Sequence, residues 1–168
     1  GIWLLTTSCA TAFVQKICNL CFPEIIATTA LTSYSIMNVI KTICNEKSNS
    51  VIVPDQSSVS IKKQDIFGTH FIYNKQEYHI SMSGAHQVQN MTTVIEAVNV
   101  LKNKGYNITE QNINDGIDKT ILPARVEVIS KKPLVILDGG HNEDGAKAFY
   151  EAVKECFDSN KKLFVIAG

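Results

Sequence analysis

The chain contains the stretch Leu122-Pro-Ala-Arg-Val-Glu-Val-Ile-Ser-Lys-Lys-Pro-Leu-Val-Ile-Leu-Asp-Gly-Gly-His-Asn142, in which an arginine precedes and an aspartate follows an apolar run. The run Leu134–Leu137 lies between a proline and a glycine, which is typical of a fully buried parallel strand. Asp138 would then lie at the carboxyl end of this strand, the edge at which open α/β sheets bind ligands. We expect its carboxylate to accept hydrogen bonds from the ribose hydroxyls of a nucleotide.

A second stretch, Ser83-Gly-Ala-His-Gln-Val-Gln-Asn90, precedes an apolar-periodic helix. Together the two stretches resemble the Gly-Xaa-His-Gln-Xaa-Xaa-Asn and Pro-Gly-Arg-Xaa-Glu…Asp-Gly-Ala-His-Asn motifs of folylpolyglutamate synthases and dihydrofolate synthases, a branch of the Mur ligase superfamily. Two motifs in the right order form a specific signal, whereas either alone would be weak. The resemblance covers residues from about Tyr34 to Gly168.

Three positions depart from the family pattern. Ala124 stands where the family has glycine, Gly140 where it has alanine, and Glu143 where it has proline. These changes leave the arginine and the aspartate untouched.

Charge and composition exclude several classes of protein. The 168 residues include 16 basic and 16 acidic side chains, so no net field attracts nucleic acid or an anionic membrane. The 45% of hydrophobic residues supports a packed core. No run reaches the roughly 18 to 20 apolar residues that a membrane helix needs, and the apolar start of the chain lacks the basic leading segment of a signal peptide.

The five cysteines suggest no metal centre. Only Cys18 and Cys21 have metal-like spacing, and no second Cys or His pair follows at a suitable distance. We expect ordinary buried thiols in a reducing cytoplasm.

Hydrophobic periodicity predicts the elements before residue 84. A helix is expected over 34–46, a short strand over 51–53, and a small antiparallel sheet over 59–82 with a turn at Asn74-Lys75-Gln76. The aromatic residues of this sheet have no basic cluster around them, so we expect cross-strand packing and not base stacking. Residues 1–31 show no clean period and receive no assignment.

The next helix should bury one apolar face and end at Gly105. Its inward residues are Val88, Met91, Ile95, Val98 and Leu101, and its other faces carry Gln87, Asn90, Glu96 and Asn99. A shorter helix should follow over 110–118, with Ile113 and Ile117 facing inward.

The chain should then enter a second domain just after Pro123. Strands are expected over 126–129, 134–137 and 163–166, and a helix over 143–157 that Asn142 caps. The inward stripe of this helix should be Ala146, Phe149, Val153 and Cys156/Phe157. Its first turn carries two carboxylates, which would repel a phosphate.

These elements predict an α/β fold in two pieces. The resemblance implies that 1–123 is the C-terminal part of a Mur-ligase-type central ATPase domain with a small antiparallel sheet, residues 1–31 being uncertain. Residues 124–168 would begin a Rossmann-like C-terminal domain. We expect a fragment, because no Gly-Xaa-Xaa-Xaa-Xaa-Gly-Lys-Ser/Thr loop occurs in the sequence.

Four residues are candidates for binding the nucleotide. The resemblance implies that Arg125 contacts ATP, and its planar guanidinium suits a phosphate oxygen; the alternative is a surface salt bridge with Glu127. Asp138 would bind the ribose or form a local turn before Gly139, and the two roles are compatible. His141 would pack on the adenine or cap nearby backbone groups.

Asn90 resembles the asparagine that recognises adenine in the family, because its amide offers a donor and an acceptor together. The alternative is a surface asparagine without a ligand. His86 and Gln87 are expected to serve the helix start or an inter-domain contact. No residue of the chain is predicted to be catalytic or to bind a metal.

The resemblance implies part of an ATP-dependent, ADP-forming ligase of folate biosynthesis and one-carbon metabolism. It would join glutamate to a folate or pteroate (dihydropteroate) carboxylate through an acyl phosphate, with ATP and with Mg²⁺ whose ligands lie outside this chain. We expect a cytoplasmic monomer without a nucleic-acid or membrane partner, and a fragment inactive alone. The alternatives are a peptidoglycan-type Mur ligase and a truncated, non-catalytic nucleotide-binding module.

Overall fold

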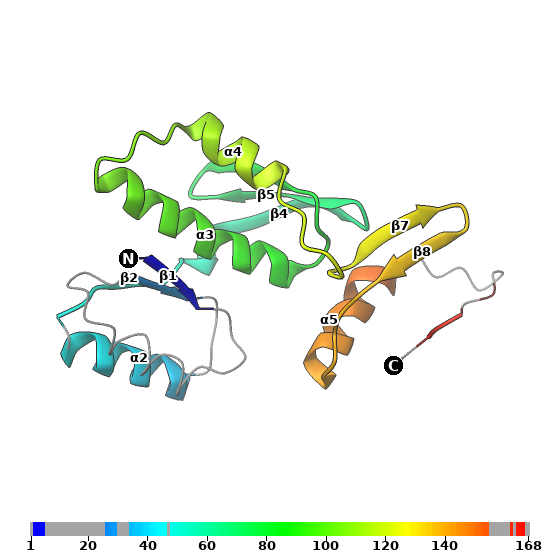
Figure 1. Cartoon of the computed structure of the whole chain (residues 1–168), viewed down its shortest axis with the longest axis horizontal. Coiled ribbons are helices and arrows are strands. Elements are labelled where there is room, and N and C mark those ends of the chain that lie inside the picture. The colour runs from blue at the N-terminus through cyan, green and yellow to red at the C-terminus, as the bar shows by residue number, and fades with distance from the viewer. Residues whose placement is uncertain are drawn as a thin grey trace.

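The computed structural model describes residues 2–5, 26–29, 34–46, 48–154, 162 and 164–166. Helix α3 (Ala85–Asn103) is its central element. It contacts strands β1 (Ile2–Leu5) and β2 (Ile26–Thr29) of one sheet, and also β5 (Gly68–Tyr73) of a second sheet. Figure 1 shows α3 between the two sheets, with the last hairpin and helix of the chain beside its first turn.

The first sheet is parallel and has the strand order β1-β2-β3, with β3 spanning Val51–Ile52. Helix α2 (Tyr34–Glu46) lies between β2 and β3 in sequence, as parallel pairing requires a crossover. The predicted helix over 34–46 is confirmed. Strands β1 and β2 come from the segment that received no assignment, because four-residue strands leave no periodicity to detect.

The second sheet is antiparallel and consists of β4 (Val59–Asp65), β5 and β6 (Gln76–Ile80). A two-residue turn joins β5 to β6, and both its residues have a positive φ. Phe71 and Tyr78 are direct cross-strand partners whose rings lie 5.6 Å apart. The predicted sheet and the predicted cross-strand packing are therefore confirmed.

The main core forms where this sheet meets α3 and α4 (Glu110–Asp118). It comprises the buried side chains of Phe71, Tyr73, Tyr78, Ile80, Met82, Val88, Met91, Ile95, Ile113 and Ile117. The hydroxyl of Thr109 accepts from the N–H of Asn112, and the Asn112 side chain accepts in return, so a capping box starts α4. Gly105, with φ of 90°, follows α3 as predicted. None of the described helices is long and apolar enough to cross a membrane.

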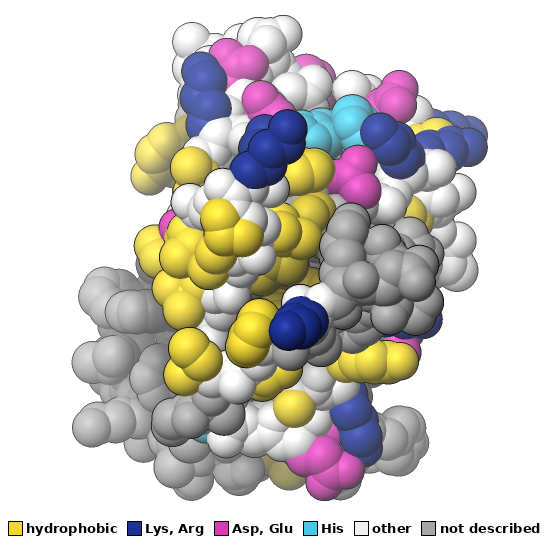
Figure 2. All heavy atoms as spheres, turned by 90° about the vertical axis from the view of Figure 1, so that its right-hand side faces the viewer, with side chains coloured by type: hydrophobic (Ala, Val, Ile, Leu, Met, Phe, Trp, Pro, Cys, Tyr) yellow, Lys and Arg dark blue, Asp and Glu magenta, His cyan; other side chains and the backbone are white. Residues whose placement is uncertain are grey.

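The prediction of a buried parallel strand at 134–137 is wrong. Strand β8 (Leu134–Leu137) pairs antiparallel with β7 (Glu127–Lys131). Only two residues join these strands, too few for the crossover that parallel pairing needs. Leu134 and Leu137 are 42% and 48% exposed. Figure 2 views the side of the molecule that carries this hairpin and shows hydrophobic side chains on its surface.

Helix α5 (Glu143–Val153) packs its last turn against Val126 and against Ile136 of β8. Asn142 caps it by accepting from the N–H of Gly145 at 2.8 Å, as predicted. Ala152 and Val153 join Val126 in a second, smaller core, whereas Ala146 is exposed, contrary to the predicted stripe. Cys156 and Phe157 lie outside the described residues.

The predicted strand over 163–166 is not formed at the three described positions, 164–166. Phe164, Val165 and Ile166 are exposed. Within the described part of the chain they have no neighbouring strand, and a strand requires a partner for its backbone groups.

One half-buried hydrogen bond ties the antiparallel sheet to α3 and can be tested. The Tyr73 hydroxyl donates to Glu96 Oε1 at 2.6 Å, and burial together with this carboxylate raises the pKa of Tyr73. A hydrogen bond to a charged group is worth about 1.5 kcal/mol or more. Tyr73→Phe should lower the free energy of unfolding by about this amount in urea titrations followed by circular dichroism. Tyr106→Phe, at an exposed tyrosine, should change it by less than about 0.5 kcal/mol; equal effects would contradict the assignment.

Candidate functional site

Two loops meet beside the β7–β8 hairpin, and the Asp138 carboxylate joins them. Its Oδ2 accepts from the N–H of Val126 at 2.9 Å, and its Oδ1 accepts from the N–H of Gly140 at 2.7 Å. The N–H of Gly139 donates to the carbonyl of Ala124 at 2.8 Å. Asp138 therefore forms the expected local turn and also holds the loop before β7. A carboxylate has about four lone-pair positions, so lone pairs of Asp138 remain that can accept hydrogen bonds from a ligand.

The loop before β7 is held in a strained conformation. Ala124 and Val126 have φ of 55° and 52°, in the left-handed region that disfavours side chains and especially β-branched ones. Such residues cost on the order of 1–3 kcal/mol each and occur preferentially at functional sites. Burial of Val126 and its bond to Asp138 stabilise the conformation.

Arg125, the only arginine in the sequence, lies between these two strained residues. Its Nη1 is 3.4 Å from the point where a Cβ on Gly139 would be. The guanidinium thus lies over the backbone beside Asp138, and a side chain at 139 would crowd it. The alternative salt bridge is absent between these two described residues: Glu127 Oε2 accepts from the N–H of Ala124 at 2.8 Å.

His86, in the first turn of α3, faces both Arg125 and Asp138. Burial lowers the pKa of the His86 imidazole from 6.5, the Asp138 carboxylate raises it, and the Arg125 guanidinium lowers it. Both charged groups therefore act on one ring at the start of α3. The expectation of an inter-domain contact at His86 agrees with this placement.

The side chain of Gln87 links those of His86 and Asn90. The Nε2 atoms of Gln87 and His86 are 3.0 Å apart, and Asn90 Nδ2 donates to Gln87 Oε1 at 3.4 Å. Asn90 is half-buried on α3. Gln87 is only 2% exposed, so its assignment to a face away from the core is wrong. Helical periodicity missed it because the first turn of α3 is also covered from outside the helix.

His141 lies at the exposed rim of the same loop. Its Nδ1 is 3.4 Å from the carbonyl oxygen of Gly139, a contact at the long limit for a hydrogen bond. The ring remains exposed and accessible for stacking. Both predicted roles of His141 are compatible with this geometry.

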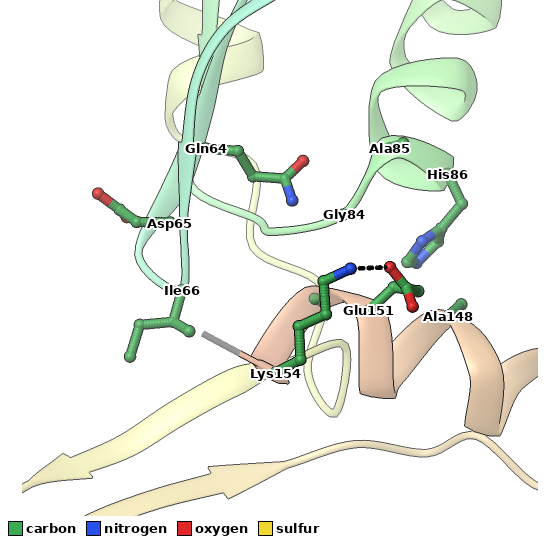
Figure 3. A pocket seen from close by; sticks show the side chains of 10 residues that line it. Gln64, Asp65, Ile66, Gly84, Ala85, His86, Ala148, Glu151 and Lys154 are labelled. Atoms are coloured by element: carbon green, nitrogen blue, oxygen red, sulfur yellow. Dashed lines mark hydrogen bonds and ion pairs between the residues drawn. The ribbon is translucent and has the colours of Figure 1, made fainter. Parts of the chain in front are cut away.

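A cleft of about 640 Å³ opens beside His86. Figure 3 shows it between Gln64 and Asp65 at the end of β4, Gly84 and His86 at the start of α3, and α5. Glu151 of α5 and Lys154, which follows the last residue of this helix, form an ion pair at the edge of the cleft. The sequence contained no signal for this cleft, because its walls come from three separate segments.

No metal centre is evident in the described residues: no group of three or more His, Cys, Asp or Glu side chains is placed to hold an ion. These residues therefore do not fit a Mg²⁺ site by themselves.

Comparisons with known proteins identify similar chains. No protein-family model matches the chain. It is 36% identical over 117 residues to a folylpolyglutamate synthase of Lacticaseibacillus casei, which covers 66% of this chain and 27% of the relative. It is 32% identical over 92 residues to a dihydrofolate synthase/folylpolyglutamate synthase of Bacillus subtilis, over 54% of this chain and 21% of the relative. The chain thus spans about a quarter of the length of the curated relatives that it matches.

Solved structures show the same fold. A folylpolyglutamate synthetase from Lactobacillus casei aligns with a TM-score of 0.73 at 23% identity, over 93% of this chain and 42% of that one. A folylpolyglutamate synthase complex with AMPPCP and folate aligns with a TM-score of 0.71 at 24% identity, over 89% and 38%. The chain has the α/β fold of a segment of these solved structures. The resemblance predicted from the two motifs is confirmed: this chain is similar to part of the folylpolyglutamate synthases and dihydrofolate synthases.

Titration of His86 tests whether the loops converge on α3. Because its folded pKa is lowered, the unfolded chain binds the proton more readily. The stability that depends on neutral His86 is full above pH 6.5 and is lost as the pH falls through the folded pKa. In NMR titrations, Asp138→Asn should lower the pKa of His86 further, and Arg125→Gln should raise it. An unchanged pKa of His86 in both variants would contradict the convergence. The His86→Asn variant identifies the imidazole resonance of His86 in the spectrum.

Proposed function

We propose that this chain supplies the base, ribose and inter-domain phosphate contacts of an ATP-dependent ligase that joins glutamate to a folate or pteroate carboxylate. One observation carries the proposal: Arg125 and Asp138 lie together on joined loops that face the first turn of α3, where Asn90 is tied to His86 through Gln87. This arrangement holds a fixed cation and a carboxylate near α3, and α3 itself carries the Asn90 amide. Those are the groups that a phosphate, a ribose and an adenine require.

The names of the relatives support the proposed substrate class. They are folylpolyglutamate and dihydrofolate synthases, and one structural neighbour is a complex with AMPPCP, an ATP analogue, and folate. We infer the same substrates for the protein of which this chain forms part or all. Glutamate would be the second substrate, and the protein would act as a cytoplasmic monomer.

The reaction would proceed in two transfers. The γ-phosphoryl group passes from ATP to a carboxylate oxygen of the acceptor, and ADP remains. The amino group of glutamate then attacks the acyl carbon, the C–N bond forms, and inorganic phosphate leaves with the carboxylate oxygen. Catalysis of this kind is mainly positioning and charge stabilisation. Mg²⁺ would accompany ATP, and the described residues of this chain take no part in holding it.

The individual residues have separate tasks in this proposal. Asn90 binds the adenine edge, the free lone pairs of Asp138 accept from ribose hydroxyls, and His141 stacks beside the base. Arg125 binds a phosphate oxygen. None of the four makes or breaks a bond.

We also propose a domain boundary between residues 123 and 124. The two buried cores lie on opposite sides of it in sequence: the larger core ends at Ile117, and the smaller begins at Val126. The positive φ of Ala124 marks the change of direction.

Nucleotide binding by the 168-residue chain tests the site. Ligand-observed NMR should detect ATP binding, and Arg125→Gln should weaken it about tenfold, the effect of losing one charge-assisted contact. Lys75→Gln removes an exposed charge in the β5–β6 turn and should have no effect. Absence of ATP binding by the wild-type chain, or equal binding by both variants, would refute the assignment.

Substrate assays test the reaction. The chain alone should release no ADP from ATP in the presence of glutamate and folate, because it contains no glycine-rich loop with a lysine for the β- and γ-phosphates. The complete protein that carries this sequence should release ADP only when both substrates are present. Release that depends instead on a nucleotide-linked muramyl acceptor would assign it to the peptidoglycan ligases.

A further inference from the structure

Gln87 is a buried amide whose two ends are both occupied. Only 2% of the residue is exposed. Its Nε2 lies 3.0 Å from His86 Nε2, and its Oε1 accepts from Asn90 Nδ2 at 3.4 Å. A buried amide that loses its partners costs free energy, so the orientation of Gln87 is coupled to both neighbours.

The directions of these bonds follow from the chemistry of the groups. An amide nitrogen can only donate, so His86 Nε2 must accept and the imidazole proton must be on Nδ1. This requires a neutral His86, in agreement with its burial and its lowered pKa. At the other end, Gln87 presents its oxygen, so Asn90 must turn its nitrogen toward Gln87.

The orientation of Asn90 decides which base it can recognise. With one N–H bonded to Gln87, Asn90 retains its Oδ1 as an acceptor and its second N–H as a donor. Adenine offers an exocyclic amino donor beside a ring-nitrogen acceptor, whereas guanine offers an exocyclic carbonyl acceptor at the same position. A freely rotating asparagine amide would match either base, because its two ends can exchange places.

We propose that Gln87 is a positioning residue that gives this nucleotide site its preference for adenine over guanine. It does so by fixing the amide of Asn90, while neutral His86 fixes Gln87. This inference rests on the proposed function, since it assumes that Asn90 meets the base. Gln87 itself touches no ligand.

The imidazole of His86 provides a test that needs no variant. The ¹⁵N chemical shifts of His86 in the wild-type chain should report a neutral ring with its proton on Nδ1. A proton on Nε2 would mean that Gln87 presents its oxygen to His86 and its nitrogen to Asn90. That result would overturn the proposal.

Nucleotide preference provides the second test. In ligand-observed NMR with ATP and GTP, the wild-type chain should prefer ATP, and Gln87→Leu should reduce the ratio of the two affinities at least fivefold. Gln87→Glu keeps an acceptor facing Asn90 and should retain the preference for ATP, although it can no longer donate to His86. Rescue by this variant separates positioning from packing.

The outcomes distinguish a failure of the proposed function from a failure of the role of Gln87 alone. A wild-type chain that binds neither nucleotide overturns the proposed function and this inference with it. A wild-type chain that binds ATP, with the same ATP-to-GTP ratio in Gln87→Leu, overturns only the role of Gln87. An equal loss of affinity for both nucleotides in Gln87→Leu also overturns it, because that is the effect of a purely structural change.

Discussion

The carboxylate of Asp138 joins the two loops that flank the β7–β8 hairpin, and the proposed nucleotide site depends on this junction. One oxygen binds the backbone of Val126 and the other binds that of Gly140. Each hydrogen bond to a charged acceptor contributes about 1.5–3 kcal/mol, comparable to the strain of holding a β-branched residue at positive φ. This carboxylate acts together with the Gly139–Ala124 backbone hydrogen bond to hold Arg125 beside Gly139.

Helix α3 contributes residues to both the main core and the candidate site. Its middle turns bury Met91 and Ile95 against the antiparallel sheet, and its first turn carries the pair His86 and Gln87. A helix held by two sheets has little freedom to shift, so the position of Asn90 is set by packing far from any ligand. The charges of Arg125 and Asp138 both act on His86 in the first turn of α3, and the same histidine lines the cleft between the end of β4, the start of α3 and α5.

Local features could be predicted from the sequence, and non-local ones could not. The helices at 34–46 and 110–118 were predicted because apolar spacing and end signals lie within a few residues. Strand 134–137 was placed correctly along the chain but with the wrong neighbour and the wrong burial. The family motifs identified Arg125 and Asp138 as a pair, yet their roles toward ATP stay predictions that binding experiments must decide.

The amino-acid sequence by itself determined where most helices and strands begin and end, the cap at Asn142, and which two motifs carry the resemblance to folate ligases. Each of these depends on side chains and backbone groups within one or two turns of one another. Only the tertiary structure decided that Gln87 is buried, that Asp138 binds the backbone of Val126, and that His86 senses both Asp138 and Arg125. The physical reason is that these interactions join segments between 12 and about 50 residues apart, and their geometry exists only after the chain has folded.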